Sequence, residues 1–291
     1  MSLRGRAELG LAMAAMIWGS TFVVVKDALV DVSPVLYLAL RFWMGTLLLL
    51  PFLRSRPSRR TVLGGMATGC FLGVGMILQT MALKYTSASN VGFLTSLYIP
   101  LVPFVGAYVY GVRTGWREVG AVLVASAGIG LMSFDPESLA VNRGDVMTVC
   151  AAVLFAFQIV MVTRFANDGE LVWLAWLQVT MTAVVSTAAI GFNLDGGNFV
   201  VWTMRLWWAF GITVFGATVA AFLLQSWGQR HTTATRAAVI FAMEPVFAGL
   251  ASYFWLGERL TGRGWTGAAL VLVGVLLAEL KPGGDKEHSS K

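Results

Sequence analysis

One carboxylate, Glu244, lies deep in an apolar stretch of the chain. Of the 15 Asp and Glu residues, it alone falls near the centre of a predicted membrane span. About eleven residues separate it from Thr233 at the start of that span, or roughly 16 Å of helix. A carboxylate at this depth is costly and indicates contact with a substrate or a proton. Two structural alternatives stay open: an ion pair with Arg41, or capping of the backbone that Pro245 frees. A neutral Glu244 is compatible with each of these.

Three glutamines also lie deep in predicted spans. Gln79 and Gln225 are 146 residues apart, and each lies in the span that precedes a proline-bearing span. Gln158 lies deep in the sixth span. Because a lipid-exposed amide is costly, these side chains are expected to face the bundle interior or a water-filled cavity. Substrate contact and hydrogen bonding between helices both agree with that position.

Aromatic side chains form a third candidate group. Trp18, Tyr98 and Trp227 lie further inside their spans than the tryptophans near span ends, which are typical of interfacial anchors. At a cavity wall they would suit a substrate with an apolar or aromatic body. Ordinary packing is the alternative for each.

Apolar segments long enough to cross a membrane position these residues. The chain has 291 residues, of which 57% are hydrophobic and 12% charged, against a usual charged share of about 25%. Apolar runs of about 18 residues or more predict helices that cross a hydrocarbon core of roughly 30 Å. Ten spans are predicted: Leu9–Val25, Pro34–Leu53, Val62–Leu83, Ala88–Tyr110, Trp116–Phe134, Asp145–Thr163, Leu171–Ile190, Leu206–Gly228, Thr233–Trp255 and Trp265–Leu280.

Glycines recur at every fourth residue of the third span. Gly65, Gly69 and Gly73 would share one face of a helix. This spacing predicts that another helix packs closely against that face.

The fourth and ninth spans repeat one pattern. Ser87–Trp116 and Thr233–Gly262 each run from small polar residues through an apolar stretch with a central proline to a Gly-x-Arg turn. The prolines, Pro100 and Pro245, are 145 residues apart, which is half the chain. Both spans are expected to tilt or bend there. Two related halves built from membrane helices are typical of a secondary transporter.

The basic residues predict the orientation of the spans. With the N-terminus inside, 14 of the 21 Lys and Arg residues fall on the inner side, six fall on the outer side, and Arg41 lies within a span. This excess follows the positive-inside rule, so the net charge of +6 indicates topology rather than nucleic-acid binding. Five spans in each half would insert the second half upside down, which predicts two inverted repeats.

Other functional classes lack the residues that they need. Both histidines lie in a short loop or the tail, and no GxSxG or HExxH motif occurs, so the sequence does not favour an enzyme. Cys70 and Cys150 have no metal-site spacing and are expected to pack as buried residues. No metal or cofactor is therefore predicted. A channel would need a ring of charges or carbonyls, whereas this chain has one deep carboxylate.

Two segments carry a resemblance to a known family. The first is MIWGSTFVVVKDALVDVSPVLYLALRFWMGTLLLLPF (Met16–Phe52), and the second is MEPVFAGLASYFWLGERLTGRGWTGAALVLVGVLL, within Gln225–Leu280. Both resemble the EamA-type repeats of the drug/metabolite transporter superfamily, and the resemblance covers nearly the whole chain. It implies ten helices around a central cavity and export of metabolites or amino acids. The chain departs from the family at Val112, where the second copy has the usual Glu258.

The expected protein is therefore an all-α membrane protein of ten helices in two inverted five-helix repeats, at 1–135 and 144–280, followed by a cytoplasmic tail at 281–291. Its expected function is export of aromatic or other neutral amino acids across the bacterial inner membrane by alternating access, with both termini in the cytoplasm. Proton coupling stays open. A multidrug or other metabolite exporter of the superfamily is the alternative, and a channel or membrane enzyme is less favoured. The predicted cavity residues are Trp18, Gln79, Tyr98, Gln158, Gln225, Trp227 and Glu244, and the predicted hinge or structural residues are Pro100, Pro245 and Arg41.

Overall fold

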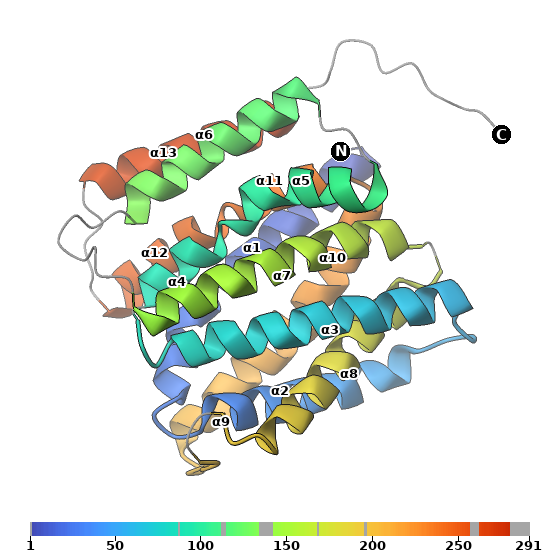
Figure 1. The fold of residues 1–291 in the computed structure, drawn as a ribbon, viewed down its shortest axis with the longest axis vertical. Helices are drawn as coiled ribbons and strands as arrows, with labels where there is room; N and C mark the ends of the chain where they lie inside the picture. The colour runs from blue at the N-terminus through green and yellow to red at the C-terminus, as the bar shows by residue number, and fades with distance from the viewer. Residues whose placement is uncertain are drawn as a thin grey trace.

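The structure, a computed structural model, describes residues 2–86, 88–111, 115–133, 142–167, 169–194, 197–256 and 262–279. Within these ranges the regular elements are helices, apart from one isolated β-bridge between Val32 and Val200. The helices are α1 (Leu3–Ala28), α2 (Pro34–Leu49), α3 (Arg59–Ala82), α4 (Ala88–Thr95), α5 (Tyr98–Tyr110), α6 (Trp116–Ser133), α7 (Arg143–Phe165), α8 (Leu171–Ile190), α9 (Met204–Gly211), α10 (Ala221–Arg230), α11 (Ala234–Phe241), α12 (Glu244–Leu256) and α13 (Gly262–Glu279) (Figure 1). A 3-10 turn, η1 (Leu50–Phe52), follows α2, and a π-helical stretch, η2 (Ile212–Ala220), joins α9 to α10.

Eight helical stretches in the described residues are long and apolar enough to cross a membrane. They are Leu3–Ala28, Pro34–Phe52, Arg59–Ala82, Val91–Tyr110, Arg143–Phe165, Leu171–Ile190, Met204–Arg230 and Ala234–Ala251, and Gly262–Ala278 is a shorter apolar helix. The fifth predicted span, which corresponds to α6, belongs to neither group, and its first turn carries Arg117 and Glu118. Length and composition therefore define a membrane protein with several spans.

Two of these stretches contain a break near the middle. Two residues separate α4 from α5, and two separate α11 from α12. Pro100 and Pro245 lie in the first turn of α5 and α12 respectively. Proline is tolerated there because a first-turn N–H has no partner within the helix. The chain thus changes direction just before each proline, and the prolines begin new helices rather than bend old ones.

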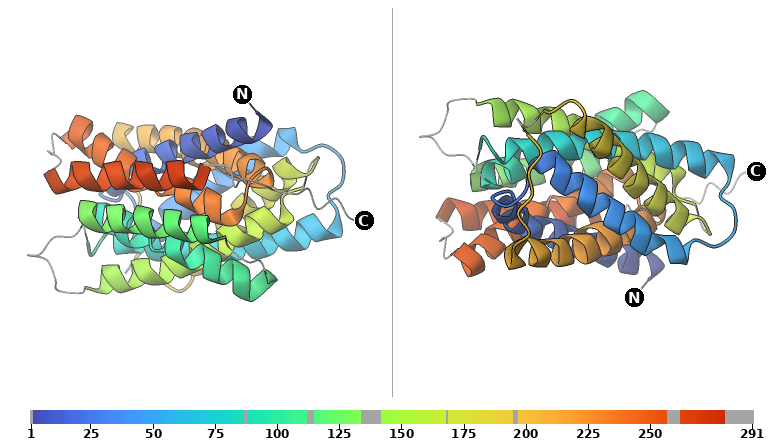
Figure 2. Two further views of the ribbon diagram at one scale, coloured as in Figure 1. Left: turned by 90° about the horizontal axis from the view of Figure 1, so that it is seen from above. Right: turned by 90° about the horizontal axis from the view of Figure 1, so that it is seen from below.

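Close packing organises the helices into a bundle. α6 and α13 lie side by side along one face of the bundle, and α2 lies against α8 on the far side (Figures 1 and 2). α3 packs against both α7 and α8. A Cβ atom at Gly65 or Gly69 would lie 2.6 Å from Leu177 Cβ or 2.5 Å from Met181 Cβ, both on α8. The glycine face of α3 is therefore a helix-packing surface, as its spacing predicts.

Two carboxylates tie loops to the starts of distant helices. Asp31, between α1 and α2, accepts hydrogen bonds from Thr203, the N-cap of α9, and from Arg205 Nη2 at 2.7 Å and Nε at 2.9 Å. Glu170, before α8, accepts from the backbone N and side-chain Oγ of Ser58, the N-cap of α3, at 2.7 and 2.8 Å. Each contact joins the first half of the chain to the second.

The Asp31 contact predicts an acid-sensitive part of the stability. The hydrogen bonds from Arg205, and then Thr203, hold the pKa of Asp31 below its ordinary value of 3.8. A carboxylate with a lowered pKa stabilises the fold above its ordinary pKa, and this contribution is lost as the pH falls through the lowered value. Asp31→Asn should therefore lower the unfolding temperature at pH 7 by a few degrees, and the difference from wild type should shrink below pH 4.

Thermal unfolding followed by circular dichroism between pH 3 and 7 measures this effect. Asp27→Asn is the matched control. The Asp27 side chain is 57% exposed, and its nearest approach to Arg205 is long, at 3.5 Å, so its loss should cost little stability. Equal unfolding temperatures for wild type and Asp31→Asn at pH 7 would show that the contact adds no stability.

Candidate functional site

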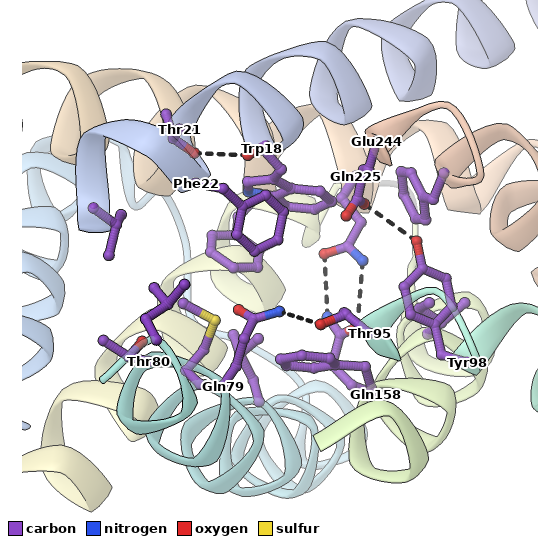
Figure 3. Close-up of a pocket in the computed structure, with 18 of the residues that line it drawn as sticks. Trp18, Thr21, Phe22, Gln79, Thr80, Thr95, Tyr98, Gln158, Gln225 and Glu244 are labelled. Carbon is purple, nitrogen blue, oxygen red and sulfur yellow. Dashed lines mark hydrogen bonds between the residues drawn. The ribbon is translucent and has the colours of Figure 1, made fainter. Parts of the chain in front are cut away.

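A cavity lies at the middle of the bundle, beside the two helix breaks. Together with the open solvent at its mouth, it holds about 760 Å³ of space free of protein atoms. Six of the seven predicted cavity residues line it: Trp18, Gln79, Tyr98, Gln158, Gln225 and Glu244 (Figure 3). Arg41, predicted as a structural residue, lines it too.

Glu244 and Tyr98 begin the helices that follow the two breaks. The Tyr98 Oη atom donates a hydrogen bond to Glu244 Oε1 at 3.2 Å (Figure 3). The two residues are 146 positions apart in the chain, and they are 3% and 8% exposed respectively. Glu244 is the first residue of α12, and Tyr98 is the first residue of α5.

Glu244 has no cation beside it in the described part of the chain. The predicted alternative of an ion pair with Arg41 is wrong: the Arg41 Nε atom instead donates to Thr218 Oγ1 on η2 at 2.8 Å. Two residues that both lie deep in spans need not meet, since their helices can present them to different sides of a cavity. The carboxylate therefore lines a cavity without a counterion of its own.

The three amides bond between helices and line the cavity at the same time. The Gln158 Nε2 atom on α7 donates to Gln225 Oε1 on α10 at 3.1 Å, and also to Gln178 Oε1 on α8 at 3.1 Å. The Gln79 Nε2 atom on α3 donates to Thr95 Oγ1 at 2.9 Å, next to the break after α4. Hydrogen bonding between helices is therefore confirmed for these residues, and substrate contact stays a prediction.

Aromatic rings form much of the remaining wall. The Trp18 ring centroid lies 5.3 Å from that of Phe222 and 5.4 Å from that of Phe241, and Trp18 Nε1 donates to the Ala217 carbonyl at 2.9 Å. Trp227 is not among the lining residues. It faces α1, where a Cβ atom at Gly10 would lie 3.1 Å from its ring.

Gly19 sets the distance between α1 and the site. A Cβ atom at this position would lie 2.3 Å from the Glu244 carbonyl oxygen and 3.0 Å from Phe247 Cβ. Only a glycine allows α1 to approach the start of α12 so closely, because the nearest obstacle is backbone that cannot rotate away. The dipeptide Trp18-Gly19 therefore supplies one wall residue and the contact that places Glu244.

The cavity extends toward one end of the bundle. Its lining includes Val25, in the last turn of α1, and Leu83, just after α3. On α7 and α10 the lining stops at least five residues before each helix ends. Beyond that point the buried Gln229 Nε2 atom on α10 donates to the Ile159 carbonyl at 2.8 Å and to Thr163 Oγ1 at 2.7 Å, both on α7. These bonds join α10 to α7 on the side away from Val25 and Leu83.

Several lining residues carried no sequence signal of their own. Met76 and Phe222 are 146 residues apart, as are Thr95 and Phe241, and all four line the cavity. The same spacing relates Gln79 to Gln225 and Tyr98 to Glu244. Extending that spacing to every deep residue would have found the missed pairs.

The two cysteines and Gly111 are not among the described residues that line the cavity. Cys70 and Cys150 are exposed rather than buried as expected. Of the two Gly-x-Arg turns, only Gly111 is described. It ends α5 with a φ of 64°, a conformation that favours glycine. Val112 and Glu258 lie outside the described residues.

Comparison with known proteins places this fold in a family. The model of the EamA-like transporter family matches the chain twice, at residues 5–134 and 142–280. An uncharacterized transporter of Archaeoglobus fulgidus is 35% identical over 94% of this chain and 86% of its own length. The probable amino-acid metabolite efflux pump of Escherichia coli is 24% identical over 91% of this chain and 92% of its own. One crystal structure has a TM-score of 0.77 at 18% identity, covering 95% of this chain and 97% of the other, and shares the fold.

The chain belongs to the EamA-like transporter family of the drug/metabolite transporter superfamily. It is a multi-pass membrane transporter, and the names of its family and relatives indicate a transporter rather than an enzyme.

Proposed function

We propose that this protein exports small metabolites, most specifically aromatic or other neutral amino acids, through the cavity beside the helix breaks. The observation that carries this proposal is the composition of the wall. Glu244, without a counterion, suits a substrate ammonium group, and the rings around Trp18 suit an apolar body. The relative from Escherichia coli that is named an amino-acid metabolite efflux pump gives independent support for the substrate class.

We further propose ten membrane helices in two inverted five-helix repeats, at 1–135 and 144–280, with 281–291 as a cytoplasmic tail. The double match of the family model supports two related halves. So does the constant spacing of 146 residues between paired lining residues, one pair of which, Tyr98 and Glu244, is in direct contact. Residues at equivalent positions of two halves meet when they lie close to a pseudo-two-fold axis.

The proposed mechanism is alternating access in the bacterial inner membrane, with both termini in the cytoplasm. In this topology the cavity reaches toward the outer side, and the Gln229 bonds close the inner side. Gln229 corresponds, at a spacing of 146, to Leu83, which lines the open side. Equivalent positions of the two halves would thus close the inner and the outer side of the cavity in turn. During this change α5 and α12 would move about the breaks before Pro100 and Pro245. Proton coupling would require Glu244 to change its protonation state during this cycle.

Export of aromatic cationic drugs is the second candidate. One observation favours it: a lone carboxylate among aromatic rings is also a suitable site for a cation without a carboxylate.

Counterflow in proteoliposomes tests the proposed function. Vesicles are loaded with one unlabelled compound and supplied outside with its labelled form, for a panel of amino acids, nucleosides and cationic drugs. Accumulation of labelled phenylalanine or another neutral amino acid supports amino-acid export, and accumulation of cationic drugs alone supports the second candidate. Ion currents in a planar bilayer without counterflow would contradict both.

A further inference from the structure

Arg41 is a buried cation without a charged partner. The residue is 3% exposed, and no carboxylate within the described ranges lies within ion-pair distance of it. Burial of an unpaired charge is strongly unfavourable, and proteins usually avoid it by pairing. The arrangement therefore indicates a partner that the described chain does not supply.

The outer nitrogens of the Arg41 guanidinium group have no partner among the described residues. Its Nε atom bonds to Thr218 Oγ1, and its central carbon lies 5.2 Å from the Phe42 ring centroid. The two outer nitrogens, Nη1 and Nη2, bond to no described residue, and neither is sealed inside the protein. Arg41 is also one of the residues that line the cavity. Two donors of a planar fork are thus free for a ligand.

The neighbouring helices hold this fork in place. One turn after Arg41 on α2, a Cβ atom at Gly45 would lie 2.6 Å from Thr218 Cγ2, so α2 and η2 pack in close contact. This contact keeps Thr218 beside Arg41 Nε. A charged group fixed by its neighbours binds a ligand with little loss of side-chain entropy.

The cavity has one charge of each sign. Among the described residues that line it, Arg41 and Glu244 alone are acidic or basic, and they do not pair with each other. A ligand that carries one positive and one negative group would satisfy both. No second Lys or Arg lines the cavity, whereas a phosphate-bearing ligand would favour two or more cations.

We propose that Arg41 binds the carboxylate of a zwitterionic amino acid while Glu244 takes its ammonium group. The guanidinium fork matches a carboxylate through two parallel hydrogen bonds. This inference rests on the proposed function and deepens it, because it gives Arg41 a role in substrate recognition instead of a structural role. Selection of amino acids over cationic drugs would then depend on Arg41.

Binding measurements with three compounds of the same apolar body test this role. Phenylalanine carries both charges, 3-phenylpropionate only the carboxylate, and phenethylamine only the ammonium group. Isothermal titration of the purified protein should show that Arg41→Gln weakens binding of phenylalanine and 3-phenylpropionate by about 10- to 100-fold. Phenethylamine should bind this variant as it binds wild type, which also shows that the variant is folded. Glu244→Gln should give the reverse pattern for the two singly charged compounds.

Arg41→Lys separates recognition from folding. It keeps the charge but not the fork, so carboxylate compounds should bind it with an affinity between those of wild type and Arg41→Gln. The proposal is overturned if Arg41→Gln binds 3-phenylpropionate as wild type does, or if wild type binds neither carboxylate compound. It is also overturned if Arg41→Gln and Arg41→Lys both lose all three compounds equally. Arg41-dependent binding of 3-phenylpropionate without amino-acid counterflow in wild type would overturn amino-acid export but keep carboxylate recognition.

Discussion

Replacing Glu244 by glutamine is expected to lower amino-acid counterflow by at least about tenfold while leaving expression and unfolding temperature close to those of wild type. The substitution keeps the size of the side chain, and the amide oxygen can still accept the hydrogen bond from Tyr98. It removes the one carboxylate among the described residues of the cavity wall, and with it the proposed partner of the substrate ammonium group. The loss should therefore appear in transport rather than in stability.

Glu8→Gln is the matched control for this variant. It makes the same chemical change at a carboxylate that pairs with Arg4 one turn away, at 2.8 Å, outside the cavity. Ion pairs between residues four apart on one helix contribute little to stability, so this variant should transport as wild type does. Counterflow by Glu244→Gln equal to that of the Glu8→Gln control would remove Glu244 from the substrate site.

Gly19→Ala is expected to destabilise the protein and to impair transport together. The added methyl group would lie 2.3 Å from the Glu244 carbonyl oxygen, and this oxygen belongs to backbone at the start of α12. Either α1 or α12 must shift, which costs about 1–3 kcal/mol in a packed interior. The shift would also move Glu244 relative to Tyr98. Unfolding temperature and counterflow, measured on the same preparation, should both fall.

A second glycine separates this effect from helix propensity. Gly106 on α5 is buried, yet a Cβ atom there would meet nothing within 4 Å. Alanine is favoured over glycine inside a helix by up to about 1 kcal/mol, so Gly106→Ala should be neutral or stabilising. If Gly19→Ala behaves like Gly106→Ala in both measurements, the close approach of α1 to α12 has no energetic consequence.

The sequence predicts the helical membrane class because hydrophobicity is a property of the chain itself. A long apolar run can be recognised without knowing which residues it contacts. Such runs predict the eight helical stretches of the described residues that could cross a membrane. The helix breaks were harder to predict. A proline in a long span indicates a bend, but it does not tell whether the helix bends at the proline or ends before it. In this fold Pro100 and Pro245 each follow a break.

The depth of a polar residue predicts that it needs a partner, but not which one. Glu244 and Arg41 were candidates for each other because both lie deep in spans of opposite halves. Which face of each helix meets which neighbour depends on packing at residues such as Gly19 and Gly45, whose contacts only the fold shows. Trp227 illustrates the same limit, because its depth is similar to that of Trp18 while its ring faces α1 rather than the cavity.

The spacing between the halves proved more informative than any single residue. The 146-residue spacing relates Tyr98 to Glu244, and the two side chains are hydrogen-bonded. We expect substrate specificity to depend on the positions at which the two halves carry different residues. Glu244 corresponds to a neutral hydroxyl, and Phe222 corresponds to Met76.

Substrate protection of a cysteine placed in the cavity tests most directly whether substrate occupies this site. With the exposed Cys70 and Cys150 replaced by alanine, Thr95→Cys would be the only thiol and would line the cavity, whereas Val30→Cys would lie in an exposed loop as the control. A phenylalanine concentration that saturates counterflow should slow modification of Thr95→Cys by a small thiol reagent several-fold and leave Val30→Cys unchanged. Equal modification rates at Thr95→Cys with and without a transported amino acid would contradict a substrate site in this cavity.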